Sequence, residues 1–118
     1  MITPQEYKKK LRKATTEIVS TTILFLQSNG PVNYTQILEA TSKSEKDEDI
    51  GRTIGGILST LSRRVIDGEP FIIPLGPDLD QPKETMRRLL WKLNPKVVDE
   101  ETRAEFLQIA KEVLDERK

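Results

Sequence analysis

Apolar residues recur at three- and four-residue steps along much of the chain, which is the spacing of amphipathic helices. The first such stretch runs from about 4 to 28, between the capping box Thr3-Pro4-Gln5-Glu6 and the stop signal Asn29-Gly30-Pro31. Its last turns, Ile23-Leu24-Phe25-Leu26, are apolar on all sides, so one neighbour cannot bury them. The pattern predicts a long N-terminal helix with a second element folded over its C-terminal end.

Two further helices are expected in the next part of the chain. A second capping box, Asn33-Tyr34-Thr35-Gln36, opens a short helix, and the polar segment 41–49 follows it. The acids of this segment precede a third helix at about 48–65, where the helix dipole favours negative charge. The apolar residues of the third helix share one face: Ile50, Ile54, Ile57, Leu58, Leu61 and Val65.

The apolar spacing changes after Pro70. The segment 71–75 is short and rich in β-branched and aromatic residues, and 89–93 alternates as a half-buried strand does. The loop between them is too long for a tight turn, so we predict a hairpin with a protruding tip over about 71–93. A last amphipathic helix is expected at about 99–116, with Phe106, Leu107, Ala110, Val113 and Leu114 on one stripe.

The 118 residues include neither cysteine nor histidine. This excludes disulfides, thiolate zinc sites, thiol nucleophiles and imidazole bases. A metal bound by Asp78 and Asp80 is the remaining enzymatic alternative, but both lie on a proline-rich loop without convergent partners. We therefore predict a protein that is not an enzyme and has no cofactor and no metal. Without an apolar run near the ~18 residues of a membrane span or a secretory signal, we expect one cytoplasmic domain over 1–118.

Charge is balanced over the whole chain but uneven along it. Nineteen basic and 19 acidic residues give a net charge of zero. Residues 1–30 and 51–98 each carry +3, whereas 31–50 and 99–118 each carry −3. An anionic partner would therefore have to meet a local face of the molecule.

The expected order of helix, short helix, helix and β-hairpin over 4–94 resembles the winged helix-turn-helix family. That resemblance implies a mainly α fold with a small β-hairpin (α+β), with long N-terminal and C-terminal helices added here. It also implies that the third helix enters the major groove of double-stranded DNA while the hairpin, or wing, touches the backbone or minor groove. The protein would then be a small transcriptional regulator.

A second resemblance concerns three short segments. Residues 32–37, 54–59 and 71–74 look like the DNA-binding domain of the alkylguanine-DNA alkyltransferases, which is itself a winged helix. The Pro-Cys-His-Arg reactive motif of that family is absent, so only a shared mode of DNA contact is implied.

The third helix bears small and cationic residues opposite its apolar face. Its outward stripe consists of Arg52, Gly56, Ser59 and Arg63, flanked by Gly55 and Thr60. Small residues let a backbone approach a groove, while hydroxyls and arginines bond to phosphates or base edges. The predicted DNA contacts from this helix and the wing are Arg52, Gly56, Ser59, Thr60, Arg63, Lys83, Arg87 and Arg88.

Other interpretations of these residues stay open. The two adjacent glycines cost about 1 kcal/mol each against alanine, and tight packing on the first helix would also explain them. The acids before Ile50 argue against deep entry of the helix N-terminus into DNA. The basic residues of the wing could simply protect an edge strand.

Apolar surfaces near both ends of the chain bear on assembly. If the last helix folds back on the first, these surfaces cover one another within one chain, and if it swings out they pair two chains. We expect a homodimer, which would present two DNA half-sites, with the interface Val19, Ile23, Leu24, Phe106, Ile109, Val113 and Leu114. The alternative function is a winged-helix module for protein assembly without DNA binding, which the zero net charge favours.

Overall fold

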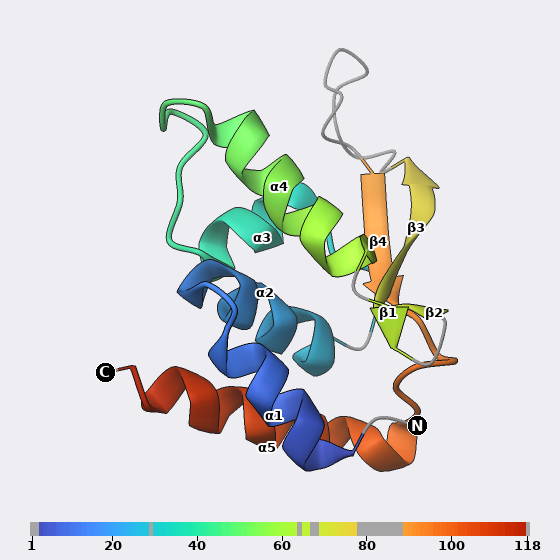
Figure 1. Cartoon of the computed structure of the whole chain (residues 1–118). Coiled ribbons are helices and arrows are strands. Elements are labelled where there is room, and N and C mark those ends of the chain that lie inside the picture. The colour runs from blue at the N-terminus through green and yellow to red at the C-terminus, as the bar shows by residue number, and fades with distance from the viewer. Residues whose placement is uncertain (1–2, 29, 64, 67–68, 78–88, 118) are drawn as a thin grey trace.

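The computed structural model describes residues 3–28, 30–63, 65–66, 69–77 and 89–117 (Figure 1). The described residues form five helices: α1 (Pro4–Arg12), α2 (Thr16–Gln27), α3 (Tyr34–Ala40), α4 (Ile50–Arg63) and α5 (Glu100–Asp115). They also form four strands: β1 (Val65–Ile66), β2 (Glu69–Pro70), β3 (Ile72–Pro77) and β4 (Leu89–Leu93). The predicted α+β class, mainly helical with a small β-hairpin, is confirmed. The helices predicted at about 48–65 and 99–116 are α4 and α5, and both lie within two residues of their expected ends.

The N-terminal helix predicted over 4–28 is interrupted in the structure. α1 ends at Arg12, and α2 begins after Thr15, whose backbone is extended. The Thr15 hydroxyl accepts a hydrogen bond of 3.2 Å from the backbone N–H of Ile18, as an N-cap does. The prediction of one continuous helix is wrong because the apolar spacing runs on through a residue that caps a new helix.

The strands form two small antiparallel pairs. β3 pairs with β4 from Ile72 opposite Leu93 to Pro77 opposite Leu89, with an irregularity between Pro74 and Gly76. Gly76 has a φ of 111°, a backbone conformation that residues with a Cβ rarely adopt. The β1–β2 pair was not expected, because the apolar pattern assigned Val65 to the third helix, whereas that helix ends at Arg63.

A β-bridge ties the β3–β4 hairpin to the segment between α2 and α3. The N–H of Val32 donates to the carbonyl of Trp91 at 2.8 Å, and the N–H of Trp91 donates to the carbonyl of Val32 at 3.0 Å. Val32 lies between α2 and α3 and is fully buried. The bridge therefore fixes the hairpin against the segment that connects these two helices.

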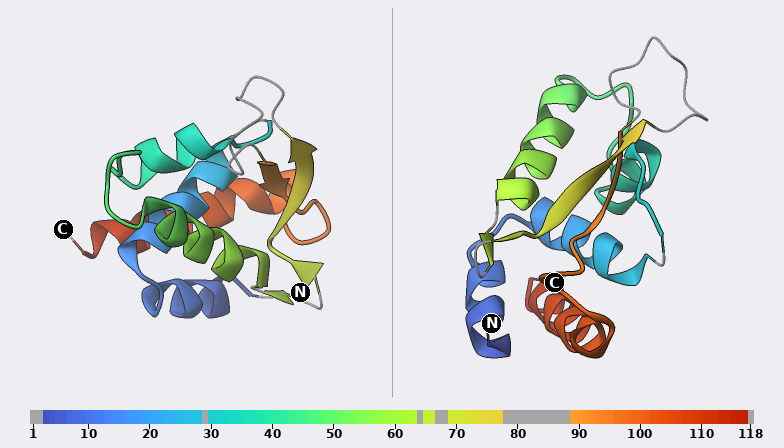
Figure 2. Two further views of the ribbon diagram at one scale, coloured as in Figure 1. Left: turned by 90° about the horizontal axis from the view of Figure 1, so that it is seen from above. Right: turned by 90° about the vertical axis from the view of Figure 1, so that its right-hand side faces the viewer.

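The helices are layered, with α2 between α4 and α5 (Figures 1 and 2). Tyr7 of α1 packs against Phe106 of α5 with ring centroids 4.7 Å apart, and against Phe71 at 6.3 Å. Phe25 of α2 is also fully buried. The core thus joins the C-terminal helix to the rest of the chain through aromatic contacts.

Two arginines of the C-terminal segment cap the helices on which α5 lies. Arg117 donates to the carbonyls of Leu11 and Ala14 at 3.1 and 2.7 Å, and so adds side-chain hydrogen bonds to the backbone at the end of α1. Arg103 donates to the carbonyl of Leu26 at 2.6 Å and to that of Ser28, at the end of α2. These bonds hold α5 in the folded-back position.

Ion pairs add to this contact between the two ends of the chain. Lys8 Nζ lies 3.1 Å from Glu112 Oε2, and Arg12 Nη2 lies 2.6 Å from Glu116 Oε2. The basic N-terminal segment and the acidic C-terminal segment therefore partly neutralise each other within one molecule.

The folded-back α5 corrects the predicted dimer interface. Val19, Phe106, Ile109 and Val113 are at most 8% exposed and belong to the core of the single chain. The chain itself already covers these four residues, so in this conformation they are not open to a second copy. The other three predicted interface residues are half-buried: Ile23, Leu24 and Leu114.

Candidate nucleic-acid interface

α4 separates an apolar face from a polar one. Ile50, Ile54, Ile57 and Leu61 are buried, which fixes the rotation of the helix about its axis. The structure places the predicted DNA contacts of α4 on the other side. Arg52, Gly56, Thr60 and Arg63 are exposed, and Ser59 is half-buried.

Both adjacent glycines of α4 face open space. A Cβ added at Gly55 or Gly56 would meet no heavy atom of the described chain within 4 Å. Their backbone is helical, so no unusual φ requires glycine at either position. The interpretation that they allow tight packing on the first helix is therefore wrong. Their cost of about 1 kcal/mol each against alanine is not offset by any close contact within the described chain.

The two arginines of α4 lie on one line along the exposed face. Arg52 and Arg63 are eleven residues apart, which corresponds to a rotation of about 20° and a rise of about 16 Å in an α-helix. Neither forms an ion pair with another described residue. Their guanidinium groups are therefore free of competition from carboxylates of the described chain.

The hydroxyls on this face differ in what they can offer. Thr60 Oγ1 donates a hydrogen bond of 2.8 Å to the carbonyl of Gly56, so its proton is already used and it can only accept from a ligand. Ser62 makes a similar bond of 3.1 Å to the carbonyl of Ser59. Ser59 lies between the two arginines, so it is the better placed donor to an anionic partner.

The acidic segment before α4 forms a turn of its own. Asp47 accepts a hydrogen bond of 2.7 Å from the backbone N–H of Ser44. Asp49 has a φ of 55°, and its carbonyl accepts the helical bond of 3.0 Å from Thr53. Exposed carboxylates thus stand at the N-terminal end of α4, where they oppose the approach of a polyanion and Arg52 is the cation of α4 that counters them.

The predicted wing contacts cannot be placed in the same way. Lys83, Arg87 and Arg88 lie outside the described residues, as do Asp78 and Asp80. In the described part of the hairpin, Leu75 is 45% exposed and Lys92 is half-buried.

Arg103 and Arg117 were not singled out from the sequence, although a signal was there. Arg103 falls on the apolar stripe of α5, one turn before Phe106, and is half-buried. Arg117 continues the same spacing one turn after Leu114 but lies beyond the end of α5, where it is exposed. An arginine on the packed side of a helix needs acceptors there, because burying an unpaired charge is costly. That spacing could have predicted that α5 lies over open carbonyl groups.

No known family model matches this chain, and neither a curated protein nor a solved structure is significantly similar to it. Within the described ranges, no helix is long and apolar enough to cross a membrane. Acidic side chains do not gather into a metal-binding group of three or more in the part of the chain that the structure describes.

Proposed function

We propose that this protein is a winged helix-turn-helix protein that binds double-stranded DNA and acts as a small transcriptional regulator. In this proposal α4 lies in the major groove and the β3–β4 hairpin is the wing beside the backbone. The order α2, α3, α4, β3, β4 supports it. The bridge between Val32 and Trp91 supports it further, because it holds the hairpin in a fixed position relative to the helices.

The observation that carries the proposal is the exposed face of α4. Arg52 and Arg63 flank a stretch without side-chain bulk at Gly55 and Gly56, where a partner surface can approach the helix backbone. Phosphates bind arginine through charge and paired hydrogen bonds, and close approach of a helix to a groove favours small residues. Gly56 and Ser59 would then lie nearest the bases.

The test is a titration of a duplex of about 20 base pairs at about 50 and about 200 mM salt. Binding should weaken steeply with salt, with a log-log slope of about −0.9 for each phosphate contact. Arg63→Glu should abolish binding, whereas Lys111→Glu, which reverses an exposed charge on α5, should leave most of it. Absence of binding at the lower salt concentration, or equal losses in the two variants, would contradict the proposal.

A second candidate function, a protein-interaction module that pairs two copies of this chain, is favoured by an apolar groove. The groove has a volume of about 230 Å³. Its lining comes from α2, α3 and α5: Ser20, Ile23, Leu24, Gln27, Ala40 and Leu114. It contains the three predicted interface residues that the fold leaves half-buried. A two-fold axis would place the grooves of two copies against each other.

Two charge substitutions discriminate between these functions. If assembly through the groove is the function, Leu24→Glu should convert a dimer to a monomer in sedimentation equilibrium and abolish cellular function, while Arg63→Glu preserves both. If DNA binding is the function, Arg63→Glu should abolish cellular function while leaving the mass unchanged. A monomeric wild-type protein would remove the second candidate.

A further inference from the structure

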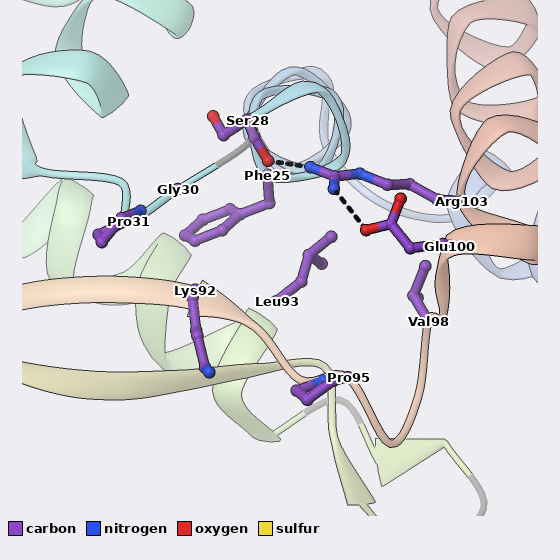
Figure 3. Close-up of a pocket in the computed structure, with 10 residues that line it drawn as sticks. All are labelled: Phe25, Ser28, Gly30, Pro31, Lys92, Leu93, Pro95, Val98, Glu100 and Arg103. Carbon is purple, nitrogen blue, oxygen red and sulfur yellow. Dashed lines mark hydrogen bonds and ion pairs between the residues drawn. The ribbon is translucent and has the colours of Figure 1, made fainter.

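A pocket of about 190 Å³ lies where the end of α2, the end of β4 and the start of α5 meet (Figure 3). Phe25, Leu93 and Val98 form an apolar part of its lining. Phe25 and Val98 are 1% and 6% exposed, so the core holds both in place. This lining suits the apolar body of a ligand smaller than a typical drug-sized molecule.

Cationic groups line the same pocket. Arg103 has five N–H donors, and its bonds from Nε to Leu26 and from Nη2 to Ser28 fix the guanidinium in one orientation. Lys92 also lines the pocket, but its ammonium points away from Arg103 (Figure 3). The pocket thus combines apolar surface with one cation, the guanidinium of Arg103, held in a fixed orientation.

A carboxylate of the protein itself already occupies the position in front of Arg103. Glu100 Oε1 lies 3.5 Å from Arg103 Nη1, and the Glu100 side chain is 91% exposed (Figure 3). An ion pair of this exposure contributes little, about 0 to 1 kcal/mol. A carboxylate held more firmly by apolar contacts would displace Glu100 into solvent without strain in the fold.

We propose that this pocket binds a small organic carboxylate. The ligand's apolar body lies against Phe25, Leu93 and Val98, and its carboxylate takes the position of Glu100 beside Arg103. The site is distinct from the face of α4, so it does not depend on the proposed DNA binding.

Hexanoate is the probe that tests this site, with hexanol and hexylamine as controls of equal chain length. Amide chemical shifts of the whole protein are followed by two-dimensional NMR during each titration. Hexanoate should give saturable shifts centred on Phe25, Val98 and Arg103, and hexanol should bind at least about tenfold more weakly. Saturation by hexanol at the same concentration, or no saturable shift with hexanoate, would overturn the proposal.

Two neighbouring acids supply a matched pair of variants. Glu100→Gln removes the competing carboxylate and should tighten hexanoate binding by up to about fivefold, whereas Glu101→Gln makes the same charge change on the same turn and should not. Both side chains are exposed, so neither variant threatens folding. Equal tightening in both variants would indicate bulk electrostatic attraction only and would overturn the proposal.

Discussion

Gly56 is a residue at which the demands of stability and of the proposed function are opposed. It lies in the interior of α4, where glycine is a poor helix former, and no neighbour of the described chain limits the space above it. A residue that costs stability without a structural reason is expected where a function requires it.

The Gly56→Ala variant should therefore be more stable and bind DNA less well. Alanine should raise the free energy of unfolding by about 1 kcal/mol, because it restricts the unfolded chain and meets nothing in the folded one. The added methyl group should weaken duplex binding by holding the groove away from the helix. Urea denaturation and a DNA titration measure the two effects. A less stable variant would show that the space above Gly56 is not open.

Arg117 acts at the same scale but on stability alone. Its guanidinium donates to carbonyls of Leu11, Arg12 and Ala14 and to the hydroxyl of Thr16. Hydrogen bonds from charged donors contribute more than neutral ones, although water can replace part of this contribution at an exposed site.

We expect Arg117→Ala to lower the free energy of unfolding by about 1 kcal/mol. Lys111→Ala, which removes an exposed cation from α5, the helix that precedes Arg117, should change it by less than about 0.5 kcal/mol. Denaturant unfolding compares the two variants directly. Equal effects would mean that Arg117 acts through its charge and not through these hydrogen bonds.

At the scale of elements, the sequence was most informative where apolar spacing and caps agree. The second capping box is formed as predicted, with Asn33 accepting from Gln36 N–H at 2.9 Å. The last helix is capped by Asp99, which accepts from Thr102 N–H at 2.9 Å. Both helices begin where these residues indicate.

The elements predicted from the sequence differ from those in the structure where a local interaction competes with the apolar pattern. The hydroxyl of Thr15 starts a new helix inside an unbroken apolar repeat. The pairing of Val65–Ile66 with Glu69–Pro70 depends on contacts between strands, and the apolar spacing before it suits a helix as well. Propensity alone could not decide either case.

The contact between α1 and α5 predicts a dependence of stability on pH. Hydrogen bonds from Lys8 and Arg12 lower the pKa of Glu112 and Glu116 respectively below the ordinary value for glutamate. Hydrogen bonds from Thr102 lower the pKa of Asp99 as well. Because the folded pKa values are depressed, this stability is present above the unfolded pKa and is lost as pH falls through the folded one.

The free energy of unfolding should therefore fall as the pH decreases below about 4.5, near the ordinary glutamate pKa. Urea denaturation between about pH 3 and 6 measures this loss. The double variant Glu112→Gln, Glu116→Gln should have a shallower dependence, because it lacks two of the titrating groups. An unchanged pH profile in the double variant would show that these ion pairs do not contribute.

At the scale of the whole molecule, the position of α5 decides which surfaces are available. The sequence allowed this helix either to fold back or to pair with a second chain, because the same apolar stripe serves both arrangements. In the structure α5 folds back, held by hydrogen bonds from Arg103 and Arg117 and by the ion pairs with α1. Four of the seven predicted interface residues are buried as a consequence.

The exposed face of α4 followed more directly from the sequence. The apolar positions of one helix fix its inner side, and the outer side is then given by geometry alone. The pocket between α2, β4 and α5 could not be predicted, because it depends on how three distant segments pack. The same holds for the open space above Gly55 and Gly56.

The salt dependence of duplex binding in the Arg52→Ala, Arg63→Ala double variant tests the account most directly. Each arginine that neutralises a phosphate should reduce the steepness of the log-log slope by about 0.9 relative to the wild type. A Lys9→Ala, Lys111→Ala double variant removes the same net charge from α1 and α5 and should keep the wild-type slope. Equal slopes in the α4 variant and the wild type would contradict the central claim that this face of α4 contacts DNA.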